Sequence, residues 1–81
     1  MQAIETTFEG GLVDLRDGVF VRCTFKSCTL FAEHSSFLLI GPTRFVGVIR
    51  VHTGRNKSAQ SQILSEWHRS AQEGSLLFED A

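Results

Sequence analysis

Large apolar residues recur at every fifth position through the first two thirds of the chain. They are Leu15, Phe20, Phe25, Leu30, Ile40 and Phe45, and only Ser35 interrupts this register. Two positions before each lies a smaller or apolar residue, namely Val13, Gly18, Cys23, Cys28, Leu38 and Thr43, with Glu33 as the exception. A period of five fits neither a flat strand nor a helix, whose periods are two and about 3.6. It predicts a squared coil that turns one large residue inward on each side and stacks its turns into a continuous core.

The same region has the local features of β structure. Short candidate strands lie at 12–15, 19–25, 29–31, 36–40 and 45–52, and β-branched and aromatic residues make up most of 19–25. Turn residues separate them at Asp17-Gly18 and Gly41-Pro42. These turns also allow an antiparallel β-meander with one packed helix, which stays open as the alternative architecture.

One stretch resembles a known pattern. Phe20-x-x-Cys23-x-Phe25-x-x-Cys28-x-Leu30 looks like the core of pentapeptide-repeat and related short right-handed β-helix proteins. The order of parts over residues 8–73 resembles small uncharacterised bacterial and phage proteins with such a core, a second coil and a C-terminal amphipathic helix. The resemblance implies a mainly β fold: a short right-handed β-helix of about two squared coils, capped or flanked by a helix. Glu33 and Ser35 depart from the five-residue pattern.

The last third predicts an amphipathic helix over residues 58–73. Its apolar face contains Ala59, Ile63, Leu64, Trp67 and Ala71. Ser58 or Ser61 is expected to cap its start, and Gly74 its end. We expect the helix to cover an open end or side of the coil. A short apolar-acidic tail, 75–81, then forms a last strand or a contact segment.

Length and composition indicate one domain over residues 1–81, with a β region at 8–52 and a basic turn at 53–57. The formal net charge of −1 gives no overall attraction to nucleic acid or membrane. We expect no membrane partner, because no apolar run approaches the length of a membrane span. The first residues do not resemble a signal peptide, so a cytoplasmic location with reduced cysteines is expected.

Three sequence patterns contain chemically capable residues. Cys23 and Cys28 with His34 or His52 include metal-ligand types, but both cysteines lie on the core register, where a buried thiol is the ordinary choice. The segment 33–36, Glu-His-Ser-Ser, holds hydrolase residue types without the spatial convergence that catalysis needs, and fits a polar turn. The segment 54–58 can hold an anion at a helix start or serve as a solvated turn. We expect no enzyme, metal or cofactor.

Charge is unevenly distributed along the chain. The basic residues Arg44, Arg50, Arg55 and Lys57 lie in a segment, between His34 and Ser65, that has no acidic residue. A stacked coil can gather such cations on one face, where they would attract an acidic protein surface or a nucleic-acid backbone. Alternatively, these basic residues are dispersed over the surface and simply solvated.

These observations favour a non-enzymatic protein–protein interaction module. Its contact surface is expected at the basic segment or at apolar residues of the helix and tail: Ile63, Leu64, Trp67, Leu76, Leu77 and Phe78. Core docking is the other reading of Trp67, and a homodimer through the helix or tail stays open. Nucleic-acid or anion binding through residues 44–57 is the alternative function. The resemblance adds a narrower expectation, a phage or mobile-element inhibitor of a host defence system, anti-CRISPR-like and acting in the host cytoplasm.

Overall fold

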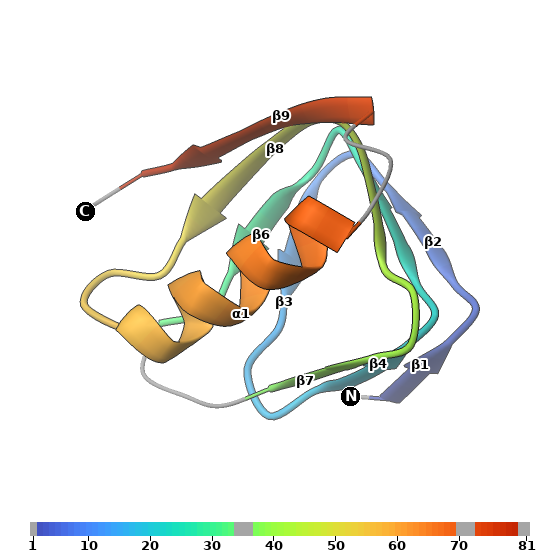
Figure 1. The fold of residues 1–81 in the computed structure, drawn as a ribbon, viewed down its shortest axis with the longest axis horizontal. Helices are drawn as coiled ribbons and strands as arrows, with labels where there is room; N and C mark the ends of the chain where they lie inside the picture. Colours follow the sequence, from blue (N-terminus) through green and yellow to red (C-terminus); the bar gives the residue numbers. More distant parts are fainter. Residues whose placement is uncertain (1, 34–36, 70–72, 80–81) are drawn as a thin grey trace.

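The chain winds into a β-helix-like coil of short parallel strands, with one helix across one end (Figure 1). The computed structural model describes residues 2–33, 37–69 and 73–79. On the first side of the coil lie β1 (Gln2–Ile4), β4 (Val19–Val21) and β7 (Leu38–Ile40). On the second side lie β2 (Thr7–Glu9), β5 (Thr24–Lys26) and the start of β8 (Arg44–His52). On the third side lie β3 (Leu12–Asp14), β6 (Thr29–Phe31) and the end of β8. The helix α1 (Lys57–Arg69) and β9 (Glu73–Phe78) follow.

Every strand pair in the described part of the chain is parallel, which confirms the coil and excludes the antiparallel meander. Each of the first two turns has three strands, whereas in the third turn the long strand β8 runs along two sides; the first side is three strands deep. Gln2 of β1 pairs with Val19 of β4, and Thr7 of β2 pairs with Thr24 of β5. Strands within these turns begin five residues apart, so the five-residue pattern marks successive sides of the coil.

The middle residue of each three-residue strand points into the coil, and β8 contributes Phe45, Ile49 and Val51 to the same core. Phe20, Phe25, Leu30 and Phe45 are buried as predicted. The rings of Phe8, Phe25 and Phe45 stack along the second side, with centroids 5.4 and 5.7 Å apart. Such offset stacking fixes the ring positions in addition to burying apolar area.

The third turn corrects the predicted core in one place. Ile40 is 46% exposed, and Leu39, at 8%, takes the inward position opposite Phe20. Leu38, expected to fill a gap inside, is 54% exposed. Six residues separate β6 from β7, whereas four separate β3 from β4, so the inward residue of β7 falls nine residues after Leu30 instead of the ten that the five-residue pattern predicts. A shift of one residue in a strand moves its side chains to the opposite face.

The helix begins and ends earlier than predicted. Asn56, not Ser58 or Ser61, caps its start, since the Asn56 Oδ1 accepts from the Ala59 backbone N–H at 3.2 Å. The helix ends at Arg69 instead of residue 73, and Ala71 lies outside the described residues. Gly74 is not a helix cap but part of β9, where it lies so close to Gly47 of β8 that a Cβ would meet the Gly47 backbone. The tail is therefore a strand, because it pairs the otherwise free edge of β8.

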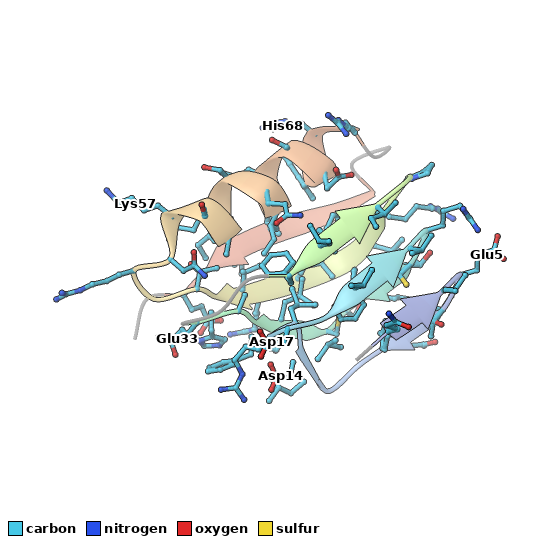
Figure 2. The ribbon with its side chains drawn as sticks, turned by 90° about the horizontal axis from the view of Figure 1, so that it is seen from below. Glu5, Asp14, Asp17, Glu33, Lys57 and His68 are labelled. Carbon is cyan, nitrogen blue, oxygen red and sulfur yellow. The ribbon has the colours of Figure 1, made fainter. Side chains whose placement is uncertain are left out.

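The helix closes the third-turn end of the coil, as predicted (Figures 1 and 2). Ala59 and Ile63 are buried in the core. The side-chain amide of Gln62 lies 3.2 Å from the Phe37 carbonyl oxygen, to which it donates, and 3.2 Å from the Leu39 backbone nitrogen, from which it accepts. A residue of a fourth parallel strand opposite Leu38 would form the same two bonds. One glutamine therefore completes the edge of β7.

Candidate interaction surface

The outward side chains of the first sheet are almost all aliphatic. The register places Ile4, Val21 and Ile40 in one column across β1, β4 and β7, and Gln2, Val19 and Leu38 in the other. Flanking residues of a three-residue strand point away from the core when the middle residue points inward. We call the outward side chains of Ile4, Val19, Val21, Leu38 and Ile40 the aliphatic face.

The aliphatic face is accessible. Ile4 is 64% and Leu38 54% exposed, Ile40 is also exposed, and Val19 and Val21 are half-buried. No described element lies outside this sheet (Figure 1). Single apolar residues on a surface are ordinary, but a contiguous apolar array is typical of an interaction site. The ladder makes this array contiguous, because neighbouring strands lie about 4.8 Å apart.

The other two sides, which share one six-stranded sheet, have mostly polar outer surfaces, although Leu12 on the third side is 66% exposed. On the second, Thr7, Thr24 and Arg44 form one column. On the third, Arg16 donates to both carboxylate oxygens of Asp14 at 2.6 to 3.1 Å, and its guanidinium lies 4.8 Å from the Phe31 ring centroid. The hydrogen bonds from Arg16 lower the pKa of Asp14 to about 2. The charges of Asp14 and Arg16 are therefore matched within the chain.

Charged residues border the aliphatic face on both margins. Arg22 follows β4 directly, and its Nε donates to Glu5 Oε1 at 3.3 Å. Asp17 lies two residues before β4, at the opposite margin (Figure 2). Arg22 and Asp17 both hold the left-handed backbone conformation, with φ of 50° and 55°, which turns the chain at the corners of the coil. The surface therefore combines an apolar centre with a charged rim, the usual anatomy of a protein interface.

The apolar residues predicted to contact a partner divide into two groups. Ile63 is fully buried within the chain, and Trp67, Leu76 and Phe78 pack against the core. Leu64 and Leu77 are exposed, at 38% and 46%. They lie on α1 and β9 and do not extend the aliphatic face, which belongs to the first sheet.

The predicted basic residues lie on different sides of the fold. Arg44 is on the second side and Arg50 on the third, where Arg50 Nη1 lies 2.8 Å from Glu79 Oε1. Arg55 and Lys57 are exposed at the start of α1, and Lys57 points away from the coil in Figure 2. The structure does not gather all four cations on one face.

The two cysteines contribute to the core. Both are buried free thiols, and the Cys23 Sγ lies 3.5 Å from the Ala3 carbonyl oxygen. Burial raises the pKa of Cys28 to about 11, which disfavours the thiolate needed for reactivity. Among residues 2–33, 37–69 and 73–79, no three His, Cys, Asp or Glu side chains cluster as a metal site. His34, Ser35 and Ser36 of the hydrolase-like segment lie outside those residues.

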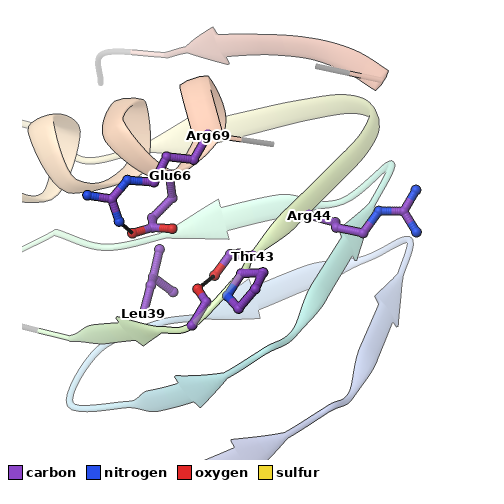
Figure 3. A pocket seen from close by; sticks show the side chains of 7 residues that line it. Leu39, Thr43, Arg44, Glu66 and Arg69 are labelled. Carbon is purple, nitrogen blue, oxygen red and sulfur yellow. Dashed lines mark hydrogen bonds and ion pairs between the residues drawn. The ribbon is translucent and has the colours of Figure 1, made fainter. Parts of the chain in front are cut away.

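A shallow hollow of about 380 Å³ lies at the Asp17 margin of the aliphatic face, beside Val19 and Leu38, and two larger ones lie elsewhere on the coil. One, of about 570 Å³, lies between the 41–44 corner and the last turns of α1 (Figure 3). Its carboxylate, Glu66, is largely buried and paired with Arg69 at 3.3 Å, while Arg44 points away from it. The other, of about 460 Å³, lies at the first-turn end and includes Phe8 and Val13. Neither combines a nucleophile with a base in a way that supports catalysis.

The sequence contains a signal for the aliphatic face that the five-residue analysis missed. When residues 2–4 are aligned with residues 19–21, which follow one turn later in the chain, Ile4 lies beside Val21.

No helix in the described part of the chain is long and apolar enough to cross a membrane. Comparisons with protein-family models, curated proteins and solved structures gave no match.

Proposed function

We propose that this chain is a protein–protein interaction module whose contact surface is the aliphatic face. The observation that carries the proposal is the contiguous outward array of Ile4, Val19, Val21, Leu38 and Ile40 on the first sheet. Burying such side chains against a partner contributes about 25 cal/mol for each Å² of apolar surface removed from water. The parallel ladder holds the array rigid, so little conformational entropy is lost on binding.

The earlier alternative, nucleic-acid or anion binding by residues 44–57, has less support from the geometry. Its affinity would depend on several cations reaching one backbone together. Arg44 and Arg50 lie on different sides of the coil, and Arg50 already pairs with Glu79. The narrower hypothesis of a phage or mobile-element inhibitor rests on the resemblance to pentapeptide-repeat-like proteins and stays a prediction.

Site-specific photo-crosslinking tests the proposal. Benzoylphenylalanine replaces Ile40 on the aliphatic face or, as the matched control, Thr7, an exposed outward residue of the second sheet. The purified chain and extracts of cells that produce it are irradiated, and adducts are identified by mass spectrometry. We expect a discrete protein adduct from position 40 and none from position 7. Equal labelling from both positions, or none from position 40, contradicts the proposal.

A further inference from the structure

We propose that the occupant of the aliphatic face is a second copy of this chain, related by a two-fold axis that runs along the stack of turns. The inference rests on the proposed function, because it names the partner of the same surface. The observation that points to it is the arrangement of opposite charges at the two margins of β4.

The two-fold axis determines which side chains meet. An axis along the stack, in the plane between two facing sheets, packs each strand against its own equivalent with the direction reversed. Val19 then meets the partner's Val21, and Leu38 meets the partner's Ile40. The contact is isologous, since each pair occurs twice. The contacts at β4 and β7 are aliphatic, whereas Ile4 of β1 meets the partner's Gln2, and facing sheets pack about 10 Å apart.

The charges select this axis over its alternative. Arg22 and Asp17 lie at opposite margins at the level of β4, so reversing the strand direction brings Arg22 toward the partner's Asp17, twice by symmetry. Asp17 is exposed, and its charge reaches Arg16, whose pKa it helps to raise, without a hydrogen bond or ion pair to Asp17 among the described residues. A two-fold axis along the strands would instead place Arg22 against the partner's Arg22. Opposite charges across an interface fix its register, and like charges disfavour it.

The same rim disfavours an anionic lipid surface as the occupant. Glu5 and Asp17 border the aliphatic face on either side, and Arg22 is already paired with Glu5. Acidic side chains are repelled by the negative potential of anionic lipid headgroups. A second copy supplies both an apolar array and the opposite charge at each margin. Three short strands make a small contact, so we expect a weak, concentration-dependent dimer.

Sedimentation equilibrium of the full chain, from about 10 to 500 µM, measures the dimer dissociation constant. We expect a monomer–dimer equilibrium in this range. Leu38→Thr with Ile40→Thr removes apolar contact but places β-branched residues suited to strands at both positions, and should weaken the dimer by about tenfold or more. Lys26→Asn, an exposed outward residue on the second sheet, is the matched control and should change nothing.

A double-mutant cycle tests the charge pairs. Asp17→Asn and Arg22→Asn keep a residue type that tolerates the left-handed conformation. Each should weaken the dimer by about threefold to tenfold, and the double variant no more than either alone, because each change removes the same two pairs. Glu5→Gln frees Arg22 from its partner in the chain and should leave the dimer intact or tighten it. Far-ultraviolet circular dichroism confirms that each variant is folded.

Three results would overturn the inference. They are a wild-type chain that stays monomeric throughout the range, a dimer that is indifferent to Leu38→Thr with Ile40→Thr, and Asp17 and Arg22 substitutions with additive effects. A monomeric chain whose position 40 crosslinks to a different, identified protein overturns the second copy but leaves the proposed function standing. A chain that stays monomeric and forms no adduct from position 40 contradicts both the dimer and the proposed function.

Discussion

The first and second sheets of the coil share one interior but have opposite outer surfaces. Inside, Phe20 of the first sheet and Phe25 of the second lie edge to face, with centroids 5.9 Å apart. Outside, the first sheet shows Ile4, Val21 and Ile40 in a column, and the second shows Thr7, Thr24 and Arg44. Inward residues are constrained by packing on every side, whereas outward residues are free to differ. Because outward residues are not constrained by packing, an outer surface that is nevertheless apolar is the best place to look for a function.

The largest expected effect tests whether the two sheets contribute equally to the interior. Phe20→Ala and Phe25→Ala should each lower the free energy of unfolding by about 3–5 kcal/mol, because both rings are fully buried. Urea denaturation followed by circular dichroism measures the loss. Since a domain of this size has little stability to lose, Phe20→Leu and Phe25→Leu serve as milder versions. A large loss of unfolding free energy at one position and almost none at the other would show that the two sheets do not contribute equally to the interior.

An intermediate effect is expected where the two sheets end differently. The outer edge of β8 is paired by β9, but that of β7 is completed by the Gln62 amide. Gln62→Ala should lower the free energy of unfolding by about 1–3 kcal/mol, because it leaves the Phe37 carbonyl and Leu39 N–H without this partner. Ser61→Ala, an exposed neighbour on the helix, should change it by less than about 0.5 kcal/mol.

Hydrogen exchange localises the Gln62 effect. The Leu39 amide should exchange faster in Gln62→Ala, while the Phe25 amide inside the ladder keeps its protection relative to global unfolding. Unchanged Leu39 exchange would show that the glutamine does not complete this edge.

The smallest effect concerns the ion pair between Asp14 and Arg16 on the third side of the coil. A carbon-13 NMR titration should give Asp14 a pKa of about 2, below its ordinary value of 3.8, and Arg16→Ala should return it toward that value. Because the folded pKa is lowered, the pair stabilises the fold above pH 3.8, and its contribution is lost as the pH falls through about 2. An unshifted Asp14 would mean that these charges are not matched within the chain.

The five-residue pattern predicted much of the coil but not its third turn. Phe20, Phe25 and Leu30 were placed inside correctly because the strands of the first two turns begin five residues apart. Phe45 returns to the register because β7 and β8 begin six residues apart. Ile40 was placed wrongly because the pattern was extended through the longer connection at residues 32–37, and a period carries no information across an insertion. The helix was recognised from its apolar face, but its ends were not, since the cap and the following strand depend on contacts with distant residues.

The candidate surface was hidden from the sequence for a related reason. Ile4, Val21 and Ile40 are separated along the chain and become neighbours only through the strand register. The predicted contact residues Ile63 and Trp67 were apolar for a different reason, since one is buried in the core and the other packs against it. Sequence patterns identify apolar residues without distinguishing those that close a core from those that remain outside.

By itself the sequence predicted the coil, most of its interior and the presence of a helix, because each depends on the local periodicity of apolar residues along the chain. Only the tertiary structure decided the number of sides, the closing of one end by Gln62 and β9, and the existence of an aliphatic face. These features depend on which turn stacks on which, and stacking is set by connection lengths and hydrogen-bond register between residues far apart in the chain.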